Sequence, residues 1–375
     1  MKKILIVAGE HSGDRHGANL IRDMKSLRQD ISFTGLGGPL MATAGAKLYR
    51  DMTEIAVVGF IEVLKHYSEF KKIFKDLVST LDSDRPDMVI LIDYPGFNMR
   101  LAREVKKRNI PLVYYISPQI WAWGKKRIKT IRETVDLMVV FFDFEKELYE
   151  KEGVPVEWVG HPFVDSITPT GPKEIVLDML GLAKEKKTIL LLPGSRRKEV
   201  EKILPIMLEA AVGVCKRRQD VQFLISKPSS MADELYESEL RKYDLPIKLT
   251  SKKNLESLTA ADFVIVASGS STLETAVMGK PMVIVYKVSP ITALMVRLLI
   301  TLPYVGLVNV VAGKRIVPEF LQGDAKPDSI AYETVSILND PMKQIQMKSE
   351  LNLVKKKLGS PGASMRAAQA ILKLL

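Results

Sequence analysis

Short apolar runs recur along this chain, each followed by a glycine-containing turn and then by residues with helical periodicity. Residues 189–192 form the central run, which ends at Pro193, Gly194 and Ser195. Residues 3–8 form another run, which ends at Gly9. A continuous apolar run of this length is typical of a strand buried on both faces, as in a parallel sheet. The pattern therefore predicts an α/β fold in which strands and helices alternate.

The apolar runs divide over two halves of the chain. Further strands are predicted at residues 88–92, 112–117, 137–142 and 156–160, and then near residues 221, 247, 263 and 281. Residues 166–173 lie between the halves and are rich in Pro, Gly and Thr, which is typical of a linker. A chain of 375 residues is also long for a single core. We therefore expect two Rossmann-like domains facing each other across a cleft, at residues 1–168 and 169–350, and a helical tail at 351–375 that packs back on the first domain.

The turn after the central run has the features of an anion site. A helix is expected from about Arg196, with Ser195 as its N-cap. The free N–H groups at a helix start and the helix dipole both favour a negative charge. Three cations follow at once and oppose the dipole unless an anion binds there: Arg196, Arg197 and Lys198. The stretch from Gly194 to Arg196 is therefore predicted to bind a diphosphate. An ordinary strand–helix turn with a solvated basic start is the alternative.

Polar residues also follow other predicted strands. Asp93 comes directly after five apolar residues, and α/β folds bind ligands at the carboxyl ends of parallel strands. We therefore take Asp93 as a candidate site residue, with a turn-capping role as the alternative. His161 lies near the end of another predicted strand, where a structural role and a polar role in a site are both open.

A serine- and glycine-rich turn follows the predicted strand near residue 263. Gly269 permits close approach of the backbone to a ligand, and Ser270 can cap a helix over a phosphate. Glu274 lies one turn further on, where it can accept hydrogen bonds from sugar hydroxyls. A capping box from Ser271 to Glu274 also fits the spacing, and both roles can hold together.

Two other glycine patterns are less informative. Gly9 and Gly13 lack the GxGxxG spacing of dinucleotide-binding folds, so an NAD cofactor is not expected. Residues 35–39, Gly-Leu-Gly-Gly-Pro, are expected to form a turn, either against a ligand or as a plain loop.

Two segments carry unusual apolar surface. Residues 60–81 place aromatic and aliphatic residues on one helical stripe, with lysines off it. Such a stripe either faces a core or lies in a membrane interface. Residues 291–300 are apolar as well, but Arg297 and Pro303 argue against a membrane span and leave a buried helix or an apolar binding surface.

The amino-acid composition limits the classes of binding partner that we expect. The net charge of +11 and a pI near 9.4 indicate an anionic partner: nucleotide, nucleic acid or membrane surface. Trp121 and Trp123 precede several basic residues, but the cluster is too local to favour nucleic acid over a substrate or core role. The single cysteine, Cys215, excludes an internal disulfide and a CxxC metal motif. Without a run of about twenty apolar residues we expect a cytoplasmic protein that meets a membrane peripherally.

Taken together, the motifs resemble the lipid-A-disaccharide synthase family of inverting glycosyltransferases with the GT-B architecture. The ordered set is specific and runs through most of the chain: Gly9-Glu10, Ser12-Gly13-Asp14, Gly35 to Pro39, Asp93 to Asn98, Ser117-Pro118, Trp121-Ala122-Trp123, Gly160-His161-Pro162, Leu192 to Arg196, Glu199-Val200, Ala267-Ser268-Gly269, Leu273-Glu274 and Asn309 to Gly313. The chain departs from the family at His11, where a small residue is usual, and at Val308, where proline is frequent. Neither departure removes an expected functional side chain.

The resemblance implies a reaction. UDP-2,3-diacylglucosamine would donate its sugar to 2,3-diacylglucosamine 1-phosphate, releasing UDP and the β-1,6 disaccharide precursor of lipid A. Asp93 is the first candidate for the base and Glu10 the second, while Arg196 would stabilise the departing diphosphate and Glu274 would hold the ribose. The remaining substrate-binding candidates are Ser12, Gly194, Ser195, Ser268, Gly269, Ser270, Asn309 and His161.

The resemblance also sets expectations for partners. No cofactor or metal is expected, and the acylated substrates suggest peripheral association with the cytoplasmic surface of the inner membrane of a Gram-negative cell. A homodimer is a further expectation. Within the same fold, a UDP-N-acetylglucosamine 2-epimerase or the transferase that makes the peptidoglycan lipid precursor would share the UDP half. A basic binding module without catalysis would bind polyanions broadly, whereas the enzyme should select UDP over ADP.

Overall fold

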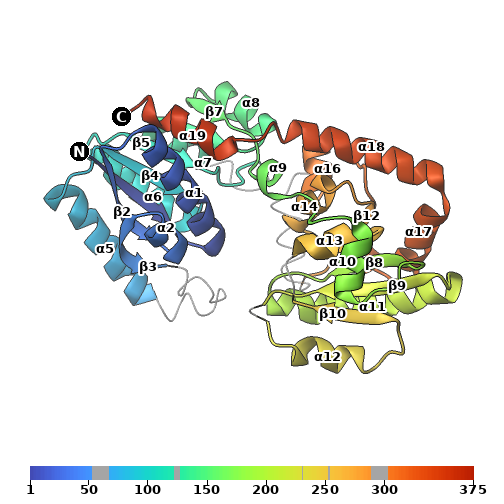
Figure 1. Ribbon diagram of the computed structural model, residues 1–375. Helices are drawn as coiled ribbons and strands as arrows, with labels where there is room; N and C mark the ends of the chain where they lie inside the picture. Colours follow the sequence, from blue (N-terminus) through green and yellow to red (C-terminus); the bar gives the residue numbers. More distant parts are fainter. Residues whose placement is uncertain (53–66, 122–126, 230, 252–253, 289–302) are drawn as a thin grey trace. The chain divides into compact units, whose positions relative to one another are not determined.

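The chain folds into two compact units, described here from a computed structural model. The structure describes residues 1–52, 67–121, 127–229, 231–251, 254–288 and 303–375. Unit 1 comprises Met1–Pro162 and Leu358–Leu375, and unit 2 comprises Phe163–Lys357 (Figure 1). The expected boundary at 168/169 therefore lies too late, because helix α9 (Phe163–Ser166) already belongs to unit 2. Likewise, only Leu358–Leu375 of the expected 351–375 tail belongs to unit 1.

Unit 1 is built on a parallel sheet of seven strands in the order β3-β2-β1-β4-β5-β6-β7. Their bounds are β1 (Lys2–Ala8), β2 (Ile31–Gly37), β3 (Ala46–Asp51), β4 (Met88–Ile92), β5 (Leu112–Tyr115), β6 (Leu137–Val140) and β7 (Val156–Trp158). The described helices are α1 (His11–Leu27), α2 (Pro39–Thr43), α5 (Tyr67–Ser83), α6 (Pro95–Lys107), α7 (Arg127–Thr134), α8 (Asp143–Lys151) and α19 (Ala363–Leu372).

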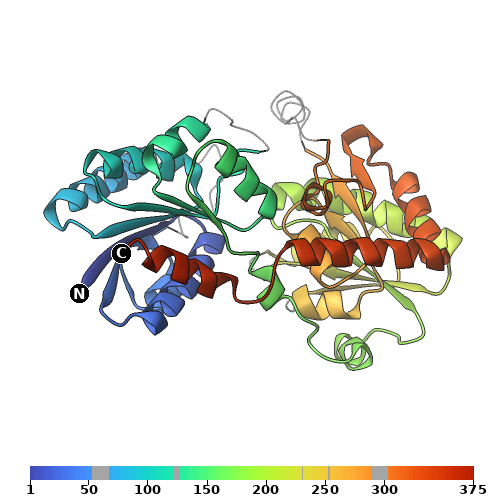
Figure 2. The same cartoon turned by 90° about the horizontal axis from the view of Figure 1, so that it is seen from above.

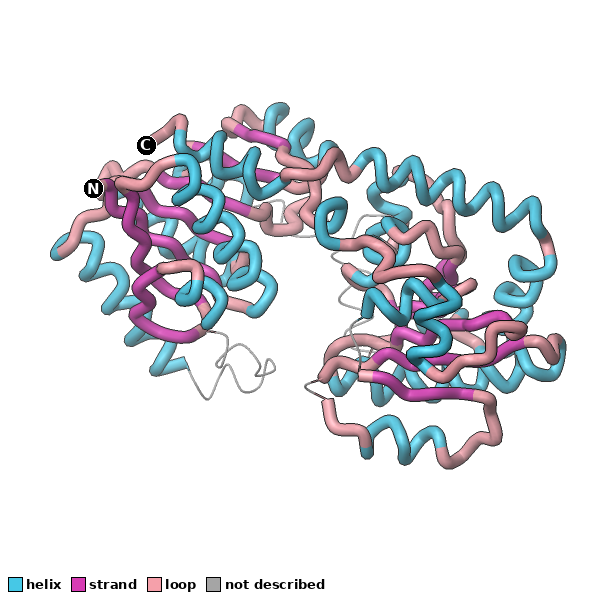
Figure 3. The backbone as a smooth tube through the Cα atoms, in the orientation of Figure 1, coloured by secondary structure: helices cyan, strands magenta, loops and turns pink. Residues whose placement is uncertain are grey.

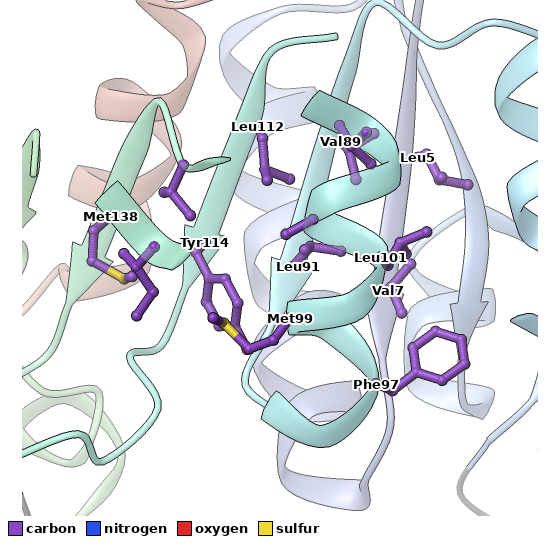
Figure 4. Packing of buried hydrophobic residues seen from close by; sticks show 14 of the residues in the cluster. Leu5, Val7, Val89, Leu91, Phe97, Met99, Leu101, Leu112, Tyr114 and Met138 are labelled. Atoms are coloured by element: carbon purple, nitrogen blue, oxygen red, sulfur yellow. The ribbon is translucent and has the colours of Figure 1, made fainter. Parts of the chain in front are cut away.

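Alternate residues of each central strand serve the two faces of this sheet. Ile4 and Ile6 pack with residues of α1, α2 and α19. Leu5 and Val7 face the other side, where residues of α5, α6, α7 and α8 cover them; Figure 4 shows α6 lying across these strands. Helix α19, at the red end of the chain, packs on α1 at the blue end (Figure 2). Because both faces are covered, the strands read as continuous apolar runs in the sequence.

The glycine-rich turn expected at residues 35–39 is only partly a turn. Gly35, Leu36 and Gly37 are the last residues of β2, and the chain turns at Gly38 into α2. Gly35 has a positive φ of 147°, and a Cβ at this position would overlap the carbonyl oxygen of Ile6. The glycine therefore serves close strand packing and a register shift against β3, which a composition-based prediction of a turn does not foresee.

Unit 2 repeats the design with a six-stranded parallel sheet in the order β10-β9-β8-β11-β12-β13 (Figure 3). Its strands are β8 (Lys187–Leu192), β9 (Val221–Ser226), β10 (Ile247–Thr250), β11 (Phe263–Ala267), β12 (Met282–Tyr286) and β13 (Glu319–Leu321). Its other described helices are α10 (Lys173–Leu180), α11 (Arg197–Arg217), α12 (Glu234–Leu240), α13 (Asn254–Ala260), α14 (Ser271–Val277), α16 (Leu307–Ala312), η1 (Gln322–Asp324), α17 (Pro327–Asn339) and α18 (Pro341–Lys357). The three-residue strand β13 is too short to show a pattern in the sequence.

Each sheet has one point where the strand order reverses. In unit 1, β1 lies between β2 and β4, and in unit 2, β8 lies between β9 and β11. Chain segments leave these neighbouring strands in opposite directions, which opens a crevice at the carboxyl ends of the strands. The loops after β1 and β4, and those after β8 and β11, are therefore the positions where a ligand site is expected in each unit.

The structure describes part of the apolar segment at residues 60–81 and none of the apolar segment at residues 291–300. Residues 60–66 and 289–302 lie outside the described residues, as do residues 122–126 with Trp123. In the described part of the first segment, Leu77 and Leu81 of α5 are buried in the unit 1 core, and Phe70 and Phe74 pack against it. This part of the stripe faces the core. Within the described residues, no helix combines the length and the apolar character needed to cross a membrane.

Candidate active site

The switch point of unit 1 is formed by the loops after β1 and β4. Ala8 pairs with Ile92, so Gly9 and Asp93 leave the sheet side by side. Asp93 and Tyr94 both adopt left-handed backbone conformations, with φ of 43° and 49°. A Cβ at Gly9 would overlap the Tyr94 ring, so the glycine makes room for that ring. Such backbone conformations are costly for residues other than glycine and persist only where surrounding contacts hold them.

Contacts from two elements, β5 and α6, hold the Asp93 backbone. Its N–H donates to the carbonyl oxygen of Tyr115 at 3.1 Å. Its own carbonyl oxygen accepts from the hydroxyl of Tyr114 at 2.7 Å and from the side-chain amide of Asn98 at 2.8 Å. Asn98 and Tyr114 are fully buried. The Asp93 carboxyl group is therefore presented from a rigid turn at the edge of the sheet, as a reacting group requires.

The environment of the Asp93 carboxyl group suits a base. Burial, and then the negative charge of Glu10, raise its pKa from 3.8 to about 6. Glu10 is the exposed N-cap residue of α1, so the two candidate acids lie together at this switch point. A base works best when its pKa lies close to the working pH. The raised pKa of Asp93 therefore favours its carboxylate as the base.

Ser12 lies in the first turn of α1 and is exposed beside these acids. The nearby Asp14, in contrast, is fully buried and has a structural role. Its carboxylate accepts from the backbone N–H groups of Gly38 and Met41, each at 2.9 Å, and of Leu40 at 3.1 Å. It thereby caps the start of α2 and ties it to α1.

His161 lies on the same side of unit 1, buried among aromatic rings. Its ring centroid is 5.2 Å from that of Phe141 and 5.4 Å from that of Phe142. His16 of α1 also contacts Phe141, with 5.3 Å between ring centroids. Burial is the main reason why the pKa of His161 falls to about 3 and that of His16 to about 4. Both imidazoles are therefore neutral at pH 7 and act as hydrogen-bonding groups rather than cations.

The switch point of unit 2 begins with the turn after β8. Gly194 has φ of 121°, and Arg196, not the expected Ser195, is the N-cap residue of α11. The Glu199 side chain accepts the N–H of this N-cap residue at 3.3 Å. The side chains of Ser195 and Arg196 are exposed at the start of a helix of 21 residues. This places cations and a helix N-terminus together, as an anion site requires.

A cavity of about 400 Å³ opens beside this helix start. It is lined by four of the residues expected from the sequence, namely Gly194, Ser195, Ser270 and Glu274. Ser270 is the N-cap residue of α14, without a side-chain cap hydrogen bond, and the expected Ser271–Glu274 capping box is absent from this helix start. The Glu274 carboxylate instead accepts from the Asn254 amide at 2.6 Å.

The lining also contains residues that the sequence did not predict, among them Lys227 and Asn254. The Lys227 side chain is 7% exposed, pairs with Asp233 at 2.7 Å and donates to the carbonyl oxygen of Met231 at 2.6 Å. The side-chain oxygen of Asn254 is buried and has no hydrogen-bond donor within the described part of the chain. Lys227 directly follows β9, and a polar residue at the carboxyl end of a strand could have been predicted as a site residue. No sequence pattern identified Asn254 as a site residue. Together with Glu274 they offer a cation, a buried acceptor and a carboxylate to a polar ligand.

The remaining candidates of unit 2 do not line this cavity. Gly269 precedes α14, and a Cβ there would meet no atom within 4 Å. The Asn309 amide is fully buried, donates to Val317 O and Glu319 Oε1, and accepts from the Ile316 and Val317 N–H groups, all within 3.1 Å. It organises the connection between α16 and β13.

Glu319 links this network to Ser268. Its carboxylate accepts from the N–H groups of Val305 at 3.1 Å and Gly306 at 2.9 Å. The Ser268 hydroxyl donates to the carbonyl oxygen of Val305 at 3.2 Å. Asn309 and Ser268 therefore both support the segment at Val305 and Gly306, Asn309 through Glu319 and Ser268 directly.

Comparisons with known proteins identify the family and the fold of this chain. A sequence model of the family described as lipid-A-disaccharide synthetase matches residues 4–373. Lipid-A-disaccharide synthase of Geobacter sulfurreducens is 43% identical over 373 residues, covering 100% of this chain and 97% of the relative. Among solved structures, UDP-N-acetylglucosamine 2-epimerase from Neisseria meningitidis bound to UDP-GlcNAc has a TM-score of 0.66 at 12% identity, covering 100% of both chains. The glycotransferase of kitacinnamycin has a TM-score of 0.64 at 16% identity, covering 100% of this chain and 99% of the other.

The structural neighbours show the fold alone, since their identities are low. They place the two parallel-sheet units among GT-B proteins, as the motifs predicted. The family match and the 43% identity extend over nearly the whole chain, and they confirm the resemblance seen in the motifs. This chain belongs to the lipid-A-disaccharide synthetase family.

Proposed function

We propose that this chain transfers the sugar of UDP-2,3-diacylglucosamine to the 6-hydroxyl of 2,3-diacylglucosamine 1-phosphate, giving UDP and the β-1,6 disaccharide precursor of lipid A. The observation that carries this function is the family match over residues 4–373. Two Rossmann-like units, each with polar residues at its switch point, are the architecture that a transferase with a nucleotide-sugar donor uses.

Unit 2 is proposed to bind the UDP-sugar. The start of α11 with Arg196 would hold the diphosphate, and it would stabilise the charge that develops there as the bond to the sugar breaks. Glu274 and Asn254, which share a hydrogen bond in the cavity, would receive hydroxyl and N–H groups of the nucleoside. The structural neighbour solved with UDP-GlcNAc supports a nucleotide-sugar ligand for this fold.

Unit 1 is proposed to bind the acceptor and remove its proton. In a single displacement, the acceptor 6-oxygen attacks C1 of the donor sugar and the bond from C1 to the diphosphate oxygen breaks. Asp93 takes the hydroxyl proton, and UDP leaves with the electron pair of the broken bond. Ser12 and the neutral His161 would act as hydrogen-bonding groups near the acceptor.

The membrane contact and the oligomeric state belong to the proposal as well. Both substrates carry acyl chains and anionic groups, and the chain has a net charge of +11. These properties support peripheral association with the cytoplasmic surface of the inner membrane. We further propose a homodimer, which sedimentation of the purified protein in detergent tests directly.

The deciding experiment measures UDP release from UDP-2,3-diacylglucosamine with and without the 1-phosphate acceptor. Release that requires the acceptor and yields a disaccharide supports the transferase. Release without the acceptor would indicate hydrolysis or epimerase-like chemistry and would overturn the assignment. The Asp93→Asn variant, which preserves the size of the side chain but removes the base, serves as the matched control.

A further inference from the structure

A second concave site lies on unit 2, at the edge opposite its switch point. It is a cavity of about 370 Å³ between the amino ends of three strands and the side of α18. Lys187 begins β8, Asp262 directly precedes β11, and Lys280 lies in the turn before β12. Lys173 of α10 and Lys348 of α18 complete the charged lining, and Gln344 adds an amide. We call this group the amino-edge lysine site.

The charge of this lining is strongly unbalanced. Four lysines face a single aspartate, a formal charge of +3. Asp262 is already used by the chain: one carboxylate oxygen accepts from Lys173 at 2.6 Å, and the other accepts the Thr188 N–H at 2.9 Å. Lys187 is 3.8 Å from the same carboxylate, a distance without a direct hydrogen bond. Asp262 therefore neutralises one lysine well and leaves most of the positive charge uncompensated.

The environment of Lys280 disfavours the charged form of its ammonium group. Its ammonium group donates to the carbonyl oxygens of Ala261 at 2.8 Å and Thr259 at 3.2 Å, at the end of α13. Burial and then the charge of Lys173 lower its pKa from 10.5 to about 8, although Asp262 opposes the shift and Lys348 adds to it. Like charges held in a concavity repel one another, and a bound anion would relieve that repulsion.

A purely structural role accounts for only part of the cluster. Lys280 caps α13, and Lys173 pairs with Asp262, so both lysines make contacts that stabilise the fold. Lys348 is exposed and forms no ion pair with any acid in the described part of the chain, and Lys187 reaches Asp262 only at the longer distance. Lys187 and Lys348 therefore line the cavity without a close ion pair in the described part of the chain.

We propose that the amino-edge lysine site binds a phosphate-class anion, either a soluble phosphate or diphosphate or the phosphate of a lipid headgroup, separately from the switch-point site of unit 2. Lysines act as point charges for phosphate oxygens. The Gln344 amide donates one N–H to the carbonyl oxygen of Leu338 at 3.0 Å, and its second N–H adds a donor to the lining. The cavity has room for a diphosphate-sized ligand. This site goes beyond the proposed transferase activity and does not depend on it.

The test compares two double variants of the full chain with equal loss of charge. Lys187→Gln with Lys348→Gln removes the two cations that the fold does not use, and both side chains are exposed, so folding should be preserved. Lys326→Gln with Lys356→Gln removes two exposed cations of unit 2 outside this lining. Pyrophosphate is titrated calorimetrically into these variants and the parent chain, all carrying Arg196→Ala as well, because that substitution removes the proposed diphosphate contact at the switch point without adding a competing diphosphate. We expect about a tenfold or greater loss of pyrophosphate affinity in the first variant and little change in the second.

A second arm identifies the source of the phosphate. Flotation with phosphatidylcholine vesicles, with and without phosphatidylglycerol, measures headgroup binding for the same two variants. A selective loss in the titration supports a soluble anion, and a selective loss in flotation supports a headgroup. Equal behaviour of both variants in both arms would overturn the proposal, whether neither changes or both lose binding alike.

A spectroscopic readout separates binding from general charge effects. Pyrophosphate in the site should raise the pKa of Lys280, because an anion stabilises its protonated form. Titration of the Lys280 side chain by NMR should show this rise in the wild type and in the control variant, but not in the Lys187→Gln and Lys348→Gln variant. An unchanged Lys280 titration in the wild type would also refute the site.

Discussion

Replacing Glu10 with Gln should move the acid limb of the transferase pH profile to lower pH without abolishing turnover. The pKa of Asp93 is raised from 3.8 to about 6, first by burial and second by the charge of Glu10. The substitution removes the second cause and leaves the first. We therefore expect the pKa of Asp93 to fall by on the order of one unit, about 1.4 kcal/mol, and to stay above 3.8.

The size of the effect follows from the ionised fraction of the base. At pH 5, a carboxyl with a pKa of about 6 is roughly one-tenth ionised, whereas one with a pKa of about 5 is about half ionised. Relative to its own plateau, the variant should thus be about fivefold more active at pH 5 than the wild type. The Glu10→Asp variant keeps the charge and should keep the wild-type limb.

The assay is kcat/KM for UDP release as a function of pH, since this parameter reports ionisations of the free enzyme and free substrates. The acceptor phosphate also titrates near pH 6, but it does so for every variant and cancels in the ratio to the wild type. Carbon-13 NMR of Asp93 provides the pKa without substrate. The reasoning is refuted if Glu10→Gln leaves the limb in place, or if it is inactive at every pH while Asp93→Asn keeps its turnover.

The remaining predictions concern both units. Arg196→Ala should weaken UDP binding about ten- to a hundredfold, since it removes a charge-assisted contact to the diphosphate; unchanged affinity by calorimetry would place the diphosphate elsewhere. Gly9→Ala should displace the Tyr94 ring, cost about 1–3 kcal/mol in unfolding free energy and reduce turnover, while UDP affinity stays the same. The folded-state pKa values of His16 and His161, about 4 and about 3, lie below the ordinary 6.5. The unfolded chain therefore binds more protons, so stability is fully present above pH 6.5 and falls by up to about 1.4 kcal/mol per pH unit for each histidine below it. Urea unfolding between pH 7 and 5 measures this, and a flat profile would contradict the buried neutral pair. Chelation by EDTA should leave turnover unchanged if, as expected, no metal takes part.

Much of the fold and part of the candidate site were predictable from local sequence. The buried strands β4 and β8 read as continuous apolar runs, because covered parallel strands need apolar residues on both faces. The short strand β13 and the strand role of Gly35 left no such signal. Gly194, Ser195, Ser270 and Glu274 do line one cavity, but Lys227 and Asn254 joined them only through the fold.

The residues of the family motifs differ in their structural role. Asp14 and Asn309 belong to family motifs, yet their side chains accept hydrogen bonds from backbone N–H groups and hold loops in place. The sequence shows that such residues matter to the protein, but it cannot separate a residue that touches a ligand from one that supports it. That distinction depends on the direction of a side chain, which neighbours from distant segments decide.

The sequence by itself determined the alternation of strands and helices, the glycine turns at the strand ends and the family, because periodicity and ordered motifs are local properties of a chain. Only the tertiary structure decided the strand orders that create the two switch points. It also decided the clamp on Asp93 by Asn98 and Tyr114, the return of α19 to unit 1, and the gathering of four lysines at one edge of unit 2. Each of these depends on contacts between residues far apart in the chain, which become neighbours only when the sheets close and bury their faces.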